Sequence, residues 1–163
     1  MKDIFSMDLQ PLEHRVPPPV VALLCALLAW GLDRALPEAR LGLPHNLPLA
    51  LGLATALLGV ALDAWALWTF RRHQTTPSPL APQRTRLVVQ AGPYAFTRNP
   101  MYVGVVLQLL GAALWLGNPL ALAAPVLFVA WVTRLQIRPE ERVLRQKFGP
   151  DYERYCARVR RWL

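Results

Sequence analysis

Two separated segments of the 163-residue chain carry most of the side chains that could do chemistry. The first reads GPYAFTRNPMY over residues 92–102 and places two tyrosines, an arginine and an asparagine where an apolar run begins. The first N–H groups of a helix have no partner within it and can bind anionic or polar ligand atoms. The segment could therefore simply turn the chain into a membrane, or it could bind a polar ligand at that point.

The second segment follows the last apolar run and reads RPEERVLRQKFGPDYERYCARVRRWL from residue 138 onwards. Its adjacent acids, Glu140 and Glu141, could be first-turn helix residues, each worth roughly 0.3–1 kcal/mol there. As a carboxylate pair they could instead bind ribose hydroxyls or a cation, or accept a proton. Arg134 and Arg138, four residues apart, could hold a substrate carboxylate or phosphate, or they could be anchors at the cytoplasmic face.

Four apolar blocks must position these two segments. The chain is 54% hydrophobic, its mean hydropathy is +0.26, and its apolar residues come in long blocks. That clustering is typical of a bilayer environment and predicts an all-α, polytopic membrane protein. A Gly-Asn-Pro sequence between the last two blocks predicts a tight turn and an antiparallel hairpin, and these two helices are somewhat short for a full bilayer at ~1.5 Å per residue. The predicted spans are residues 20–36, 47–70, 101–116 and 120–137.

The expected organisation is a single membrane domain of about four transmembrane helices with a cytoplasmic, helical C-terminal tail. Prolines in the central loop exclude a long helix there. In chain order the parts are a cytoplasmic arm (1–18), the first two spans (20–70), a cytoplasmic loop (71–100), the hairpin (101–137) and the tail (138–163).

The tail is expected to contain two short helices. One begins at Pro139 and ends near Phe148, because the Gly-Pro sequence that follows cannot continue it. Asp151 can cap the second helix. The apolar face of that helix is expected to carry Tyr152, Tyr155 and Val159.

The basic residues predict the orientation of the chain. The net charge is +8, and most arginines lie in the loop 71–100 or after residue 133. Basic residues prefer the cytoplasmic side, so both termini, the loop and the tail are expected there, and a bacterial inner membrane is the expected location. The loop and the tail can then form one site together.

Several other classes of site are disfavoured. Cys25 and Cys156 have different surroundings, the three histidines lack ligand spacing, and no metal is expected. Nucleic-acid binding is not expected either, because no recognised fold or aromatic-basic platform accompanies the positive charge. Asp63, inside the second span, could be functional, could reach the interface, or could form an interhelical hydrogen bond.

The two segments and the hairpin between them resemble the isoprenylcysteine carboxyl methyltransferase / phospholipid methyltransferase family of integral membrane enzymes. The resemblance covers roughly residues 73–163 and rests on order, spacing and topology. Its motif residues are Gly92-Pro93-Tyr94, Arg98-Asn99-Pro100, Tyr102, Gly104, Glu140-Glu141, Phe148-Gly149, Tyr152 and Tyr155.

The resemblance implies transfer of a methyl group from S-adenosylmethionine to a lipophilic acceptor, with a carboxylate or amine head group, that enters from the bilayer. Many members have histidine where Asn99 stands. Asparagine can form hydrogen bonds but does not titrate near neutral pH, so Asn99 is assigned to binding. The implied cofactor-binding residues are Gly92, Pro93, Tyr94, Arg98, Asn99, Pro100, Tyr102, Gly104, Glu140, Glu141, Tyr152 and Tyr155.

The same pattern gives catalytic candidates and leaves two alternatives. The catalytic candidates are Glu141, Glu140 and Arg138, and the candidates for binding the acceptor head group are Arg134 and Arg138. One alternative is an NADPH-dependent membrane reductase of the sterol or polyprenyl type, whose C-terminal half looks similar. The other is a non-catalytic membrane protein that binds acidic lipid or a partner through its basic tail.

Overall fold

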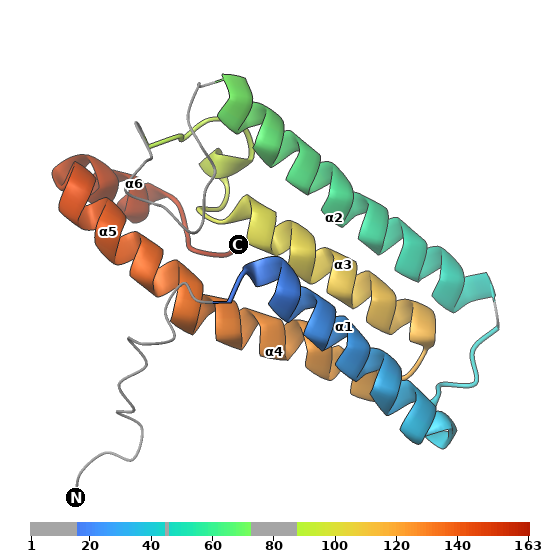
Figure 1. The fold of residues 1–163 in the computed structure, drawn as a ribbon. Coiled ribbons are helices and arrows are strands. Elements are labelled where there is room, and N and C mark those ends of the chain that lie inside the picture. The colour runs from blue at the N-terminus through green and yellow to red at the C-terminus, as the bar shows by residue number, and fades with distance from the viewer. Residues whose placement is uncertain (1–15, 45, 73–87) are drawn as a thin grey trace, which may run out of the picture.

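The computed structural model describes residues 16–44, 46–72 and 88–163. Over these residues it is almost entirely helical, with one isolated β-bridge and no strand, which confirms the predicted all-α membrane protein. Three helical stretches are long and apolar enough to cross a membrane, namely Pro18–Ala35, Asn46–Arg72 and Pro119–Phe148, and Pro100–Leu116 is a shorter apolar helix. Figure 1 shows these helices side by side in one bundle.

The helices agree closely with the predicted spans. Part of the predicted loop 71–100 lies outside the described residues, as does most of the arm 1–18. The helices are α1 (Pro18–Ala35), α2 (Asn46–Arg72), α3 (Pro100–Leu116), α4 (Ala123–Val132), α5 (Arg138–Phe148) and α6 (Pro150–Arg158).

The fourth apolar block and the start of the tail differ from the prediction. A π-helical turn, Thr133–Ile137, joins α4 directly to α5, so Pro139 lies within a continuous helical stretch rather than starting a separate helix. A proline in a helix interior removes one i→i−4 hydrogen bond, and here it directly follows a turn whose hydrogen bonds already depart from that pattern. The predicted cap was wrong: Gly149 is the N-cap of α6, and Asp151 instead pairs with Arg154 on the surface.

Glycines allow α2 and α3 to pack very closely. Gly52 of α2 faces Gly111 of α3, and Gly59 faces Gly104 one heptad further along. A β-carbon built on Gly59 would lie 2.5 Å from the Gly104 carbonyl oxygen, and one built on Gly52 would lie 2.6 Å from that of Gly111. Small residues of this kind let membrane helices approach backbone to backbone. On its remaining sides α2 exposes leucines and valine, as expected for a helix in lipid.

A polar clamp closes the end of the bundle farthest from the tail (Figure 1). Asp33 of α1 is 1% exposed and accepts two hydrogen bonds from Arg40, from Nε at 2.7 Å and from Nη2 at 2.5 Å. Asn118, in the turn between α3 and α4, donates to the Leu36 carbonyl at 3.0 Å. The clamp therefore ties the α1–α2 connection to the α3–α4 turn.

We expect Arg40→Met to lower the free energy of unfolding by about 2–3 kcal/mol, because it leaves the buried Asp33 carboxylate without its cation. This value lies below the about 3–5 kcal/mol of a fully buried pair, because the Arg40 side chain is 51% exposed. Thermal unfolding in detergent measures the loss. Arg34→Met is the control, since Arg34 stacks on Trp30 at 5.5 Å and acts on Asp33 only as the weakest of the charges and hydrogen bonds around it. An equal loss in both variants would contradict the role of the clamp.

Candidate functional site at the loop–tail end of the bundle

The loop before α3 and the C-terminal tail meet at one end of the bundle, as their predicted shared side requires (Figure 1). Thr97 and Arg160 form a parallel bridge, and the Arg98 N–H donates to the Arg160 carbonyl at 2.9 Å. Asn99 Nδ2 donates to the carbonyl of Arg161 at 2.9 Å. The residues around the start of α3 therefore hold the last residues of the chain in place.

Glu141 lies at the centre of this junction and is 3% exposed. Arg98 Nη2 donates to its Oε1 at 2.7 Å, and Arg161 donates through Nε at 3.0 Å and Nη2 at 2.7 Å. A third guanidinium, that of Arg145, lies 4.0 Å away. Burial would raise the pKa of Glu141, but the hydrogen bonds from Arg161 and Arg98 together hold it below its usual range. Glu141 is therefore a fixed anion.

Three of the predicted binding or catalytic residues therefore form hydrogen bonds within the junction itself, namely Arg98, Asn99 and Glu141. Arg98 also donates from Nη1 to the Val159 carbonyl at 2.6 Å, and Asn99 is engaged with the tail backbone. One group retains bonding capacity, because Arg98 Nε is buried and makes no hydrogen bond within the described part of the chain.

Glu140, next in sequence, has a different environment. The Tyr102 hydroxyl donates to Glu140 Oε1 at 3.0 Å, and Gln136 Nε2 donates to the same oxygen at 2.6 Å. No cation pairs with Glu140 among the described residues, and burial raises its pKa to about 7 despite these two hydrogen bonds. Glu140 is therefore able to gain and lose a proton near neutral pH.

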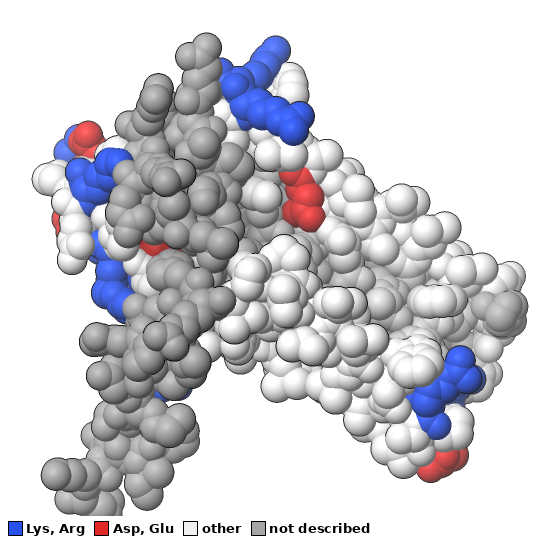
Figure 2. All heavy atoms as spheres, in the orientation of Figure 1, with Lys and Arg blue, Asp and Glu red and all other residues white. Residues whose placement is uncertain are grey.

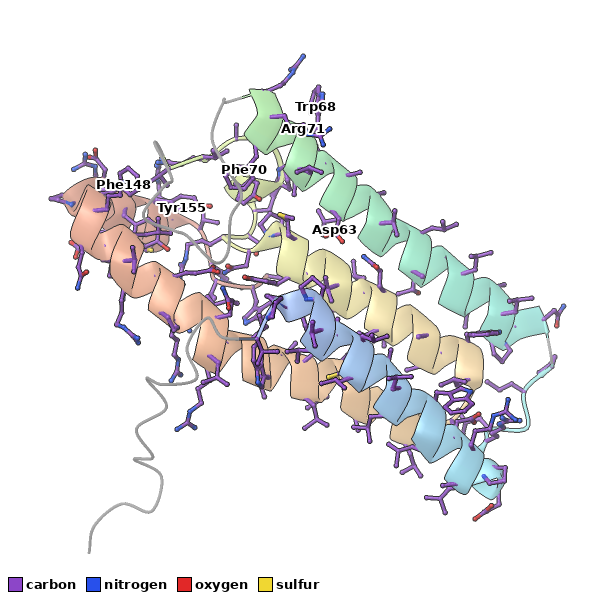
Figure 3. All side chains as sticks on the ribbon, in the orientation of Figure 1. Asp63, Trp68, Phe70, Arg71, Phe148 and Tyr155 are labelled. Carbon is purple, nitrogen blue, oxygen red and sulfur yellow. The ribbon has the colours of Figure 1, made fainter. Side chains whose placement is uncertain are left out.

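The turn that contains Tyr94 packs against the end of α2. Gly92 adopts φ +60, and a β-carbon there would lie 2.7 Å from Thr69 Oγ1. The Tyr94 ring meets Phe70 edge-on at 4.8 Å, and Tyr155 donates its hydroxyl proton to the Tyr94 carbonyl at 2.8 Å. Figure 3 shows Phe70 and Tyr155 at this end of the bundle.

Tyr94 lies within electrostatic reach of two acids on different helices. Burial raises the pKa of its phenol most, and the charges of Tyr155, Asp63 and Glu140 raise it further. The short helical turn Gly92–Ala95 thus brings an aromatic hydroxyl towards both the α2–α3 contact and the Tyr102–Glu140 pair.

The remaining predicted residues serve packing in this structure. Tyr152 and Tyr155 are each 3% exposed and form a cluster with Val159, which confirms the predicted apolar face of α6. Pro93 and Pro100 are fully buried. Gly104 lies beneath Asp63, where a β-carbon would come within 1.9 Å of Asp63 Oδ1.

Asp63 forms an interhelical hydrogen bond, one of the roles that the sequence left open. Gln108 Nε2 of α3 donates to its Oδ2 at 2.7 Å. Figure 2 shows an acidic patch on the otherwise uncharged flank of α2, at the place where Figure 3 labels Asp63.

Arg134 and Arg138 are exposed and are not part of the Tyr102–Glu140 pair. Arg134 instead borders a groove between α1 and α4, whose other lining residues are Val21, Cys25, Leu127, Ala130, Trp131 and Leu135. Glu140, by contrast, meets α3. The arginine and the glutamate therefore project from different sides of one helical stretch.

Sequence reasoning missed Gln136 and Arg161. Gln136 is a fully buried amide in an apolar block, four residues before Glu140, and that spacing on a helix was the signal that could have identified it. Arg161 looked like one of many tail arginines, and nothing in its local sequence distinguishes it. Within the described ranges no group of three potential metal ligands is found.

Comparisons with known proteins identify a family and several relatives. A family model described as "Phospholipid methyltransferase" matches residues 47–151. A probable protein-S-isoprenylcysteine O-methyltransferase of Oryza sativa subsp. indica is 30% identical over 108 residues, which is 66% of this chain and 56% of the relative. Protein-S-isoprenylcysteine O-methyltransferase B of Arabidopsis thaliana is 31% identical over 108 residues, 66% of this chain and 55% of the relative.

A shorter relative matches along its whole length. An uncharacterized protein of Haemophilus influenzae is 46% identical over 63 residues, 39% of this chain and 100% of the relative. The chain spans only a little more than half the length of the plant relatives. No solved structure matches the chain.

Proposed function

This chain belongs to the phospholipid methyltransferase family, and on that premise we propose that it transfers a methyl group from S-adenosylmethionine to a lipophilic acceptor with an amine or carboxylate head group. The observation that carries the proposal is the Tyr102–Glu140 pair, a carboxyl with a pKa of about 7 held by a phenol where the apolar helices end. A water-soluble cofactor and a membrane-dissolved acceptor can both reach that level of the bundle.

The residues at the junction suit the polar groups of S-adenosylmethionine, which supplies an electrophilic methyl group when bound. Glu140 can accept hydrogen bonds from a ribose hydroxyl or an ammonium group. Arg98 Nε is a buried donor without an acceptor among the described residues, as expected where a ligand carboxylate completes a site. Tyr94 and Tyr102 would form the aromatic wall between them.

The two adjacent glutamates would have different roles. Methyl transfer to a carboxylate needs no base, whereas an ammonium head group must lose a proton before its nitrogen can attack. Glu140 can take that proton because its pKa lies near neutral pH, while Glu141 is fixed as an anion by Arg98 and Arg161. The protein would otherwise act by holding the nucleophile and the methyl group in line and by excluding water.

The proposal also concerns the head group of the acceptor and the orientation of the chain in the membrane. Arg134 and Arg138, which the sequence suggested for the acceptor head group, are exposed just before and at the start of α5. Because Arg134 projects from another side of this stretch than Glu140, these arginines would act on an acceptor only by attracting its charge to this end of the bundle. The concentration of arginines in the loop and the tail supports a cytoplasmic location of the site and both termini, in a bacterial inner membrane.

The test is methyl transfer by Glu140→Gln. With a labelled cofactor and acceptors of equal chain length, we expect at least a 100-fold loss of turnover with an amine and a smaller loss with a carboxylic acid. In the unchanged protein, turnover of the amine should rise with pH through about 7, as Glu140 ionises. Calorimetric binding of NADPH without binding of S-adenosylmethionine or S-adenosylhomocysteine would overturn the proposal in favour of a reductase.

The same variant should stabilise the fold. The folded-state pKa of Glu140, about 7, lies above its ordinary value of 4.5. Between these values the unfolded chain is ionised while the folded chain keeps its proton, so stability falls as pH rises from 4.5 to 7 and stays low above it. Glu140→Gln removes this penalty, and we expect a gain of about 3 kcal/mol at pH 8 and almost none at pH 4.5. Thermal unfolding at both pH values measures it, and an equal gain at both would contradict the raised pKa.

A further inference from the structure

The groove between α1 and α4 has a polar end as well as apolar walls. Val21 and Cys25 line it from α1, and Leu127, Ala130 and Trp131 line it from α4. Arg134, in the π-turn that follows α4, borders the same groove. Among the described residues that line the groove, Arg134 is therefore the one charged side chain, and it lies at the end towards α5.

Two further arginines extend this positive charge along α5. Arg138 and Arg142 follow Arg134 at intervals of four residues, and all three side chains are exposed. Residues four apart lie on one side of a helix, so these arginines form a basic strip that continues from the mouth of the groove. Figure 2 shows basic side chains along the part of the molecule where Figure 1 places α5.

The groove lies within the apolar part of the bundle and the strip lies beyond it. Leu127, Ala130 and Trp131 belong to the apolar helix α4, whereas α5 is amphipathic and rich in charge. In a bilayer an apolar groove is filled by hydrocarbon, and a basic residue at the head-group level attracts a lipid phosphate. One molecule with a hydrocarbon chain and an anionic head would satisfy both surfaces.

We propose that this groove and strip bind one anionic phospholipid of the surrounding bilayer, with an acyl chain between α1 and α4 and the phosphate against Arg134 and Arg138. A strip of positively charged arginines attracts a lipid head group with a net negative charge more strongly than a zwitterionic head group. The bound lipid is a resident lipid and not the methyl acceptor, because Glu140 meets α3 on another side of the same helical stretch. Arg134 and Arg138 would then hold this lipid rather than the acceptor, and its retention can be measured without any methyl transfer.

Lipid retention tests the site directly. The protein is purified from vesicles with equal amounts of phosphatidylglycerol and phosphatidylcholine of identical chains, and the lipids that stay bound are quantified by native mass spectrometry without any methyl donor. We expect at least fivefold enrichment of phosphatidylglycerol at a stoichiometry of one. Ala130→Phe should fill the groove and lower retention at least fivefold, while Arg134→Gln should remove the preference between the two lipids.

Matched controls separate the site from general effects. Val126→Phe places the same side chain one turn earlier on α4, at a residue that is 67% exposed and does not line the groove, and it should retain lipid normally. Arg154→Gln removes one exposed arginine from α6 and should keep the preference. Ala130→Leu replaces Ala130→Phe if the larger side chain prevents folding.

The outcomes that overturn the proposal are specific. Undiminished retention in a folded Ala130→Phe or Ala130→Leu variant would show that lipid binds elsewhere. Equal retention of both phospholipids would exclude a role for the arginines. Displacement of phosphatidylglycerol by an equimolar long-chain fatty acid would show that the groove takes any anionic lipid and is not a phospholipid site. None of these results depends on whether the protein transfers methyl groups.

Discussion

Glu141→Ala is expected to release the C-terminal tail from the bundle and to abolish cofactor binding. The substitution leaves Arg98 and Arg161 facing each other in a buried junction without the carboxylate that now accepts three hydrogen bonds from them. Removing one partner of a buried ion pair costs about 3–5 kcal/mol, because the remaining charge is uncompensated. Limited proteolysis should cut the variant within α6, which is held by this junction, and thermal unfolding should show the loss of stability.

The control is Glu153→Ala, which removes an exposed acid from α6 and should leave proteolysis and stability unchanged. Glu141→Gln should be nearly as damaging as Glu141→Ala, since an amide cannot neutralise two guanidinium groups. A comparison with Glu140→Gln is the sharper test, because the neighbouring substitution is expected to stabilise the fold. Equal effects of the two glutamine variants would contradict the assignment of a fixed anion to Glu141 and a titrating acid to Glu140.

The sequence could not separate these two glutamates. Neighbouring residues on a helix point about 100° apart, so Glu140 and Glu141 necessarily face different surroundings. Which of them faces the arginines depends on the rotation of α5 relative to α3 and the tail. The π-turn Thr133–Ile137 contributes to that rotation, and no local feature of the sequence predicts this turn. The chemistry of the pair was therefore predictable, but the division of roles was not.

Most of the fold was predictable because a bilayer imposes simple rules. Long apolar blocks must be helices, since no water is available to satisfy the backbone in hydrocarbon, and the blocks at 20–36, 47–70 and 101–116 match α1, α2 and α3. The continuous helical stretch through Pro139 was not predicted, since a proline followed by two acidic residues is typical of a helix start. Contacts between distant parts of the chain depend on how the helices pair, so the hydrogen bond from Asn118 to the Leu36 carbonyl could not be predicted either.

The association of α2 and α3 gives the other large expected effect. Gly59→Leu should separate these helices, because its β-carbon would lie 2.5 Å from a backbone carbonyl oxygen of α3, which no side-chain rotation can relieve. Overpacking usually costs about 1–3 kcal/mol, and a clash with backbone lies at or above the upper end of that range. We expect most of the variant to be aggregated or unfolded after extraction into mild detergent, as size-exclusion chromatography and thermal unfolding would show.

Gly31→Leu is a stringent control, because it makes the same change inside α1 where nothing lies within 4 Å of the new β-carbon. Leucine also favours a helix over glycine by about 0.8 kcal/mol, so this variant should be as stable as the unchanged protein or more so. Equal destabilisation of both variants would mean that any large side chain in the spans is damaging and that close helix contact is not the cause.

Gly104 was assigned to cofactor binding by resemblance, and substitutions at this residue can show whether it is instead needed for helix packing. Gly104→Ala would place its β-carbon 1.9 Å from Asp63 Oδ1 and 2.9 Å from the Gly59 carbonyl oxygen. Asp63→Ala removes the first of these clashes, so adding it to Gly104→Ala should restore part of the lost stability. A role in cofactor binding alone predicts no such rescue, and it predicts lost cofactor affinity in a protein of normal stability. The double variant therefore distinguishes a glycine that lets two helices touch from a glycine that lets a ligand approach.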